Sequence, residues 1–116
     1  MEYQPVPVQL DLNDPEEGFT FSCSKGGLAL SLVDWRAKRI HLSFENVFKF
    51  CFAISDRYRG LPQAGFIEIL DSPDVRELVS DHVAGVGDAL RHFVISTNED
   101  EWCEVIASRY DFKIDA

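Results

Sequence analysis

The stretch from Arg39 to Ile54 constrains the fold more than any other, because its apolar side chains recur at every second position. Successive side chains of a strand point to opposite faces, so this alternation predicts a long strand with one buried face. The even positions, of which only Asn46 is polar, are Ile40, Leu42, Phe44, Asn46, Phe48, Phe50, Phe52 and Ile54. A helix is the competing interpretation, with a stripe of Phe44, Val47, Phe48, Cys51 and Phe52. We favour the strand, because the alternation begins before Phe44 and continues to the end.

Short alternating segments with turn signals between them occupy most of the remaining chain, which is typical of an antiparallel sheet. Phe19–Cys23 and Leu28–Val33 flank a Gly-Gly pair and predict a hairpin. Val6–Leu12 alternates as well, but Pro5 and Pro7 would confine it to a sheet edge. Further strands are expected at Phe66–Leu70, Leu90–Thr97 and Trp102–Ile114, the last with a bend near Ala107-Ser108-Arg109. The predicted fold class is α+β, a curved, mostly antiparallel meander of about five to seven strands with one helix.

One segment departs from the strand pattern and predicts the single helix, near residues 73–84. Ser72 can cap the free amide groups, Pro73 suits the first helical position, and Asp74 complements the helix dipole. Apolar residues at helical spacing follow. His82 belongs to this stripe, so we expect its side chain to be packed and hydrogen-bonded.

The inward faces of these elements should form one core, because a chain of 116 residues can bury a core without metal ions or disulfide bonds. We expect a single domain, residues 1–116. The residues expected to be buried are Leu30, Leu42, Phe44, Phe50, Phe52, Leu78, Phe93 and Ile106. Cys23, Cys51 and Cys103 lie far apart in strand-like runs, so we expect reduced and largely inaccessible thiols.

The net charge is −9, and residues 60–116 carry most of it, with 12 acidic residues against 4 basic ones. Such charge repels phosphates and anionic lipids, which argues against binding to nucleic acid or to a membrane surface. It suits a basic protein partner, although acidic residues that only keep the protein soluble are the simpler interpretation. Neither a membrane-spanning run of roughly 18 apolar residues nor a signal peptide is found, so we expect a cytoplasmic protein.

No motif for catalysis, metal binding or cofactor binding is found in the sequence. His41, His82 and His92 lack metal-ligand spacing, and no pair of cysteines completes a zinc site. Nucleophilic catalysis would need a cysteine beside His92 across a sheet, and nothing in the sequence fixes that geometry. We therefore expect no catalytic residue, no metal and no cofactor. The alternative is a small enzyme or ligand-binding domain with a polar pocket near His92.

Several segments together resemble a known group of proteins. They are Trp35-Arg36, Arg39–Val47, Ile69–Pro73, His92–Ser96 and Trp102–Ala107. In this order they are similar to small bacterial β-rich domains, some of which resemble immunity proteins of polymorphic toxin systems. The resemblance implies a non-enzymatic protein that binds another protein. An acidic immunity protein would mask the basic substrate-binding surface of a nuclease-like toxin.

A basic partner would meet the acidic second half of the chain, where clustered charge speeds encounter and aromatic side chains anchor the contact. The expected partner-binding residues are Asp74, Glu77 and Asp81 on the helix, Glu99, Asp100, Glu101 and Glu104 around the last hairpin, and the anchors Trp102 and Tyr110. The three helical acids recur at three- and four-residue steps, so one helix face can present them all. The loop Arg57-Tyr58-Arg59 is the next candidate.

Overall fold

The computed structural model describes residues 2–53 and 60–115, so the candidate loop Arg57-Tyr58-Arg59 lies outside the described residues. In chain order the elements are β1 (Tyr3–Pro5), β2 (Glu17–Ser24), β3 (Gly27–Val33), β4 (Arg39–Glu45), β5 (Lys49–Ala53), β6 (Phe66–Ile69), α1 (Pro73–Ser80), a 3₁₀ turn (Val86–Asp88), β7 (Arg91–Ser96), β8 (Trp102–Ala107) and β9 (Arg109–Asp115).

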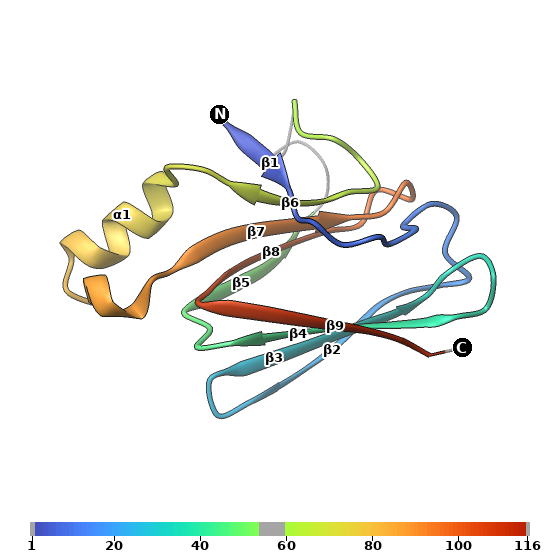
Figure 1. The fold of residues 1–116 in the computed structure, drawn as a ribbon, viewed down its shortest axis with the longest axis horizontal. Helices are drawn as coiled ribbons and strands as arrows, with labels where there is room; N and C mark the ends of the chain where they lie inside the picture. Colours follow the sequence, from blue (N-terminus) through green and yellow to red (C-terminus); the bar gives the residue numbers. More distant parts are fainter. Residues whose placement is uncertain (1, 54–59, 116) are drawn as a thin grey trace.

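The strands form two antiparallel sheets that lie one above the other (Figure 1). Sheet A has the order β1-β6-β7-β8-β5, and sheet B has the order β2-β3-β4-β9. The predicted fold class is confirmed, because antiparallel strands dominate and one α-helix is present among the described residues. The described residues form nine strands in two sheets, so the predicted single meander of five to seven strands is wrong. Two predicted long strands are each divided between the sheets, which raises the number of strands.

The stretch from Arg39 to Ile54 provides the first of these divisions. Its first half is β4 in sheet B and its second half is β5 in sheet A, so the helical interpretation is wrong. The alternation continues across the change of sheet. The space between the sheets is faced by Leu42 and Phe44 of β4 and by Phe50 and Phe52 of β5. A single unbroken pattern therefore spans two strands of two different sheets.

The second division occurs at the bend predicted near Ser108, where the chain leaves β8 for β9. Both crossings are at the same corner of the molecule, because β4 pairs with β9 and β5 pairs with β8. Between these two paired regions, one chain segment has three residues, Asn46–Phe48, and the opposite segment has two, Ala107 and Ser108. The extra residue makes a β-bulge, which bends the pair of strands. Asn46 has φ 56°. Its side-chain amide donates to Ser108 Oγ (2.9 Å) and to Asp88 Oδ1 (3.1 Å).

Replacing Asn46 with valine is expected to lower the free energy of unfolding by about 1–3 kcal/mol, because a β-branched residue is strained at positive φ. The change also removes both hydrogen bonds of the amide. Asn46→Gly keeps the backbone relaxed and is the matched control, with a smaller expected loss. Urea unfolding of the three proteins measures this, and equal losses for both variants would assign the effect to the hydrogen bonds rather than to the backbone.

The core lies between the sheets and confirms most of the predicted burial. Leu30, Leu42, Phe44, Phe93 and Ile106 are each at most 1% exposed. All except Ile106 belong to the cluster between the two sheets. Ile106 lies on the outward face of β8, and the strands β7 and β8 are buried along both faces.

Two of the predicted core residues are exposed, and a third is half-buried. Phe50 and Phe52 are each 37% exposed, because β5 is the edge strand of sheet A. They face the other edge strand, β2, where the ring of Phe21 lies 5.8 Å from Phe50 and 4.7 Å from Phe52. Leu78 is only half-buried, because α1 buries none of its residues fully.

Helix α1 begins as predicted but ends earlier, at Ser80 rather than near residue 84. Ser72 Oγ accepts the Val75 amide hydrogen (3.2 Å), which confirms the predicted N-cap. The chain leaves the helix at His82, which has φ 59°, and the amide of Ala84 then bonds back to Leu78. His82 is consequently exposed, and the prediction that its side chain packs on the helical stripe is wrong.

The N-terminal segment also differs from the expected edge strand over Val6–Leu12. The edge strand is β1, which pairs with β6, and the chain after Pro5 has no regular structure up to β2. Val6 and Leu12 are nevertheless buried in the core between the sheets. The alternation of apolar residues in this segment therefore reflects their burial in the core and not a strand.

The three thiols differ in accessibility, so the prediction of three inaccessible cysteines is wrong. Cys23 is exposed because it lies on the edge strand β2, Cys51 is half-buried, and Cys103 is fully buried between the sheets. Burial raises the pKa of the Cys103 thiol to about 12, with smaller contributions from Cys51 and Glu104.

In the native protein at neutral pH, a thiol reagent is expected to modify Cys23 at about the rate at which it modifies a fully exposed thiol. Cys103 is expected to react only when the protein unfolds. The reactive species is the thiolate, which burial and the raised pKa suppress at Cys103. Mass spectrometry of peptides from samples quenched at intervals measures both rates. Modification of Cys103 as fast as that of Cys23 would contradict the burial of Cys103 between the two sheets.

Candidate functional site

The predicted acidic contact residues lie at two opposite ends of the molecule. Asp74, Glu77 and Asp81 belong to α1 and its C-cap, whereas Glu99 and Asp100 lie in the turn that joins β7 to β8. The strands β7 and β8 run between these two ends (Figure 1). The two groups of acids therefore cannot form one continuous contact surface.

Three of the predicted contacts are not at the surface. Trp102 is 5% exposed and Glu104 is 3% exposed, because β8 is covered on both faces. Tyr110 is half-buried, and its ring packs 5.4 Å from those of Phe66 and Phe93. The assignment of these three residues to a partner contact is therefore corrected: they are built into the fold and present little or no surface to a partner.

The turn between β7 and β8 meets a second acidic segment that the sequence reasoning did not include. The Asp14 amide donates to Asn98 Oδ1 (2.7 Å), and Asn98 Nδ2 donates to Asp14 Oδ1 (2.9 Å). Figure 1 shows the segment before β2 lying beside this turn. The resulting group, here called the acidic end, consists of Asp14, Glu16, Glu17, Glu99, Asp100 and Glu101. Among the described residues these acids form one ion pair, between Glu17 and Arg39 (3.4 Å).

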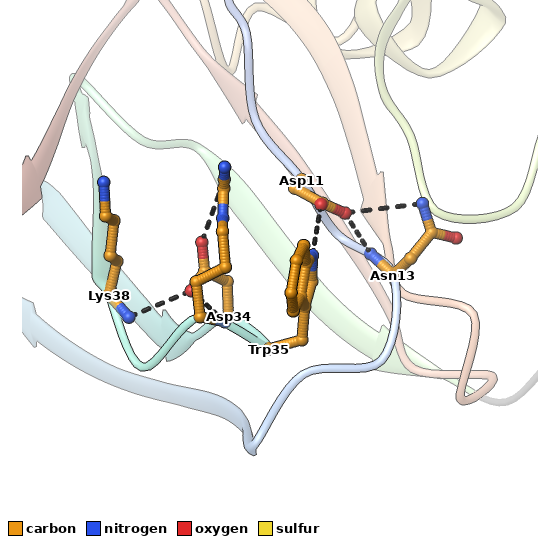
Figure 2. Close-up of polar contacts among 6 residues, drawn as sticks. Asp11, Asn13, Asp34, Trp35 and Lys38 are labelled. Carbon is orange, nitrogen blue, oxygen red and sulfur yellow. Dashed lines mark hydrogen bonds and ion pairs between the residues drawn. The ribbon is translucent and has the colours of Figure 1, made fainter.

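An exposed tryptophan lies next to the acidic end, on the turn between β3 and β4. The turn is fixed by the buried carboxylate of Asp34, which accepts hydrogen bonds from the amides of Arg36 and Lys38 (2.9 Å each). Figure 2 shows the hydrogen bond from the Lys38 amide to the Asp34 carboxylate, with Trp35 next to Asp34 in the same turn. The turn adjoins the acidic end because the Glu16 amide donates to the carbonyl of Val33 (2.9 Å). Trp35 thus belongs to a turn whose backbone is held by hydrogen bonds.

The indole of Trp35 is 54% exposed and is held in place on one side. Its Nε1–H donates to Asp11 Oδ2 (2.5 Å), as Figure 2 shows, and the Arg36 guanidinium lies 5.4 Å from the ring centre. The hydrogen bond from Trp35, followed by that from the Asn13 amide, lowers the pKa of Asp11, so this carboxylate stays charged. Asp11 and Arg36, which contact the indole, also line an open hollow of about 540 Å³ together with Val8, Gln9, Leu10 and Asn13.

This group could have been suspected from one signal in the sequence. A tryptophan in a short polar turn, Asp34-Trp35-Arg36, does not alternate with any strand pattern and so has no evident place in a core. From the sequence, Trp35-Arg36 entered only the resemblance and was not among the expected partner-binding residues. The contact between Asp14 and Asn98 has no sequence signal, because the two residues are far apart in the chain.

A second polar group surrounds His92, on the outward face of sheet A. Ser72 Oγ lies 2.7 Å from His92 Nδ1, and His92 Nε2 lies 2.7 Å from Glu104 Oε1. All three side chains are buried. A pocket of about 250 Å³ opens beside them, lined in part by Arg76 and Arg91. This pocket lies next to His92, where the alternative interpretation placed its ligand.

One group of metal-ligand type is found in the described part of the chain, and it includes the same histidine. Ligand atoms of Asp74, His92 and Glu104 all lie within 4.8 Å of one another. The three residues come from α1, β7 and β8, so no short spacing in the sequence connects them.

Comparison of the chain with family models, curated proteins and solved structures finds no match. Within residues 2–53 and 60–115, no helix is long and apolar enough to cross a membrane.

Proposed function

We propose that this protein is a non-catalytic protein-binding module that recognises a basic protein surface. The contact would be made by the acidic end together with the exposed indole of Trp35. The observation that carries the proposal is the position of Trp35, an exposed, hydrogen-bonded tryptophan beside two acidic segments that converge from distant parts of the chain.

The chemistry of this surface fits such a partner. Carboxylates grouped at one end of a molecule with net charge −9 attract a basic surface over the Debye length and orient it during encounter. Tryptophan is among the residues that most often dominate interface energies. Because Asp11 and Asp34 hold Trp35 and its turn in place, little conformational entropy would be lost on binding.

The finer form of the proposal is toxin neutralisation. The resemblance of several segments to immunity-type domains, together with the acidic surface, supports a partner whose basic surface binds a polyanionic substrate. The protein would then cover that surface, without chemistry of its own.

The test uses a candidate partner, such as the product of the neighbouring gene, and measures association at several salt concentrations. Reversing Glu99, Asp100 and Glu101 to lysine is expected to slow association and to flatten its dependence on salt. Trp35→Ala is expected to weaken the affinity about 30-fold, since a tryptophan anchor typically contributes about 2 kcal/mol or more.

The matched control reverses two acids at the opposite end, Glu77 and Asp81, to lysine. This variant should associate almost as fast as the parent protein, because its charges lie far from the proposed contact. If the Glu77 and Asp81 reversal slows binding while the Glu99–Glu101 reversal does not, the interface is on α1 and the proposal for the acidic end is wrong. A partner that binds instead in the pocket beside His92 would be insensitive to both.

A further inference from the structure

The group formed by Asp74, His92 and Glu104 combines one imidazole with two carboxylates, and their ligand atoms all lie within 4.8 Å of one another. Imidazole nitrogen with carboxylate oxygen is a ligand set that suits Zn²⁺ and similar divalent transition ions. We propose that these three residues bind one such ion, with Zn²⁺ as the reference, and that the ion joins the start of α1 to the centre of sheet A.

The geometry needs only small movements of side chains. Bonds of about 2.0–2.2 Å to nitrogen and oxygen place tetrahedral ligands about 3.3 Å apart. His92 Nε2 and Glu104 Oε1, now 2.7 Å apart, would separate slightly. The Asp74 carboxylate would turn inward, and because it lies at the first turn of α1 this requires no change in the sheet.

The other nitrogen of His92 already has the partner that a metal-binding histidine usually has. Nδ1 lies 2.7 Å from Ser72 Oγ, which also accepts the Val75 amide hydrogen at the N-cap of α1. With Nε2 on the metal, Nδ1–H would donate to Ser72 Oγ, which fixes the ring and its tautomer. Ser72 therefore orients the ligand and caps the helix with the same oxygen atom.

The charges at the site fit a divalent cation. His92 Nε2 and Glu104 Oε1 are hydrogen-bonded, and the ion would take the place of this bond. The two carboxylates then balance a charge of +2. Lys49 Nζ lies 3.7 Å from Asp74 Oδ2 and would have to turn away, which its 43% exposed side chain allows.

Access to the site is from the side of Asp74. The Asp74 side chain is 36% exposed, whereas those of His92 and Glu104 are 8% and 3% exposed. An ion bound by three protein ligands keeps one position for water, and this position would face the same opening. Among the described residues the group contains no thiol. Cys103 faces the opposite side of β8 from Glu104, whereas Cys51 pairs with Glu104 across the sheet but is not part of the group.

The experiment is a calorimetric titration of the full chain with Zn²⁺ alone, in a Cys23→Ser background that removes the exposed thiol. We expect one bound ion per chain and a rise of Tm on adding it. His92→Ala, Glu104→Gln and Asp74→Asn should each weaken this binding at least tenfold. His82→Ala and His41→Ala, which change histidines elsewhere, should leave it unchanged.

A second measurement identifies the donor atoms. Co²⁺ in the same site should give weak visible bands of nitrogen and oxygen ligation without a thiolate charge-transfer band. Asp74→Asn changes a half-exposed residue and keeps its shape, so circular dichroism should confirm that this variant folds and its result is decisive. Absence of binding, or one-site binding that Asp74→Asn and Glu104→Gln leave unaltered, would overturn the proposal.

Discussion

Replacing Phe93 with alanine is expected to lower the free energy of unfolding by about 3–5 kcal/mol, the usual loss for a fully buried phenylalanine. Phe93 is 0% exposed, and its ring packs against Phe44 (5.5 Å), Phe66 (5.8 Å) and Tyr110 (5.4 Å) between ring centres. These rings come from both sheets, so the structure cannot close around the missing side chain without moving one sheet against the other. Urea unfolding measures the loss.

The matched control is Phe50→Ala, which removes the same side chain from a sheet edge. Phe50 is 37% exposed and contacts the equally peripheral Phe21, so less apolar area returns to water on unfolding and no enclosed cavity forms. We expect a loss below about half that of Phe93→Ala. Equal losses would mean that Phe50 is packed against Phe21 as completely as Phe93 is packed in the core.

These two phenylalanines mark the limit of what alternation reveals about burial. Both lie at inward positions of alternating strands, and the sequence predicts both to be in the core. Their different exposure depends on strand order, because β7 lies inside sheet A whereas β5 is at its edge. Strand order follows from long-range pairing, which no local pattern contains.

The division of Arg39–Ile54 between two sheets illustrates the same limit in another way. Alternation predicted the inward positions on both sides of the break, and those positions hold in both strands. The break itself left one signal, Asn46, the single polar residue among the even positions and a residue type that tolerates positive φ. The bend near Ser108 was predicted because both faces of that strand carry apolar residues, and the structure confirms it.

The sequence predicted the candidate sites less well than it predicted the fold. Charge counting identified the acidic turn at Glu99 and Asp100, but only the contact between Asp14 and Asn98 brings the second acidic segment to it. Glu104 was assigned to the same surface because it follows these acids in sequence. In the strand β8 it points to the outward face of sheet A and meets His92 there, since a residue on β8 lies beside those of β7.

The hydrogen bond between His92 and Glu104 leads to the second large expected effect, measured with a chelator present so that no metal ion contributes. His92→Ala is expected to lower the free energy of unfolding by about 3–5 kcal/mol, because Glu104 loses this bond while its carboxylate stays buried. Glu104→Gln keeps a side chain that can still pair with the imidazole, so a loss of about 1–3 kcal/mol is expected.

The double variant separates this bond from the general loss of packing. In His92→Ala with Glu104→Gln, the buried carboxylate has been replaced by a neutral amide, so the cost of His92→Ala should fall. We expect the combined loss to be smaller than the sum of the two single losses by about 1–3 kcal/mol, the range for residues in direct contact. Additive losses would mean that His92 contributes through packing and through Ser72 alone, and that its bond to the Glu104 carboxylate adds nothing to stability.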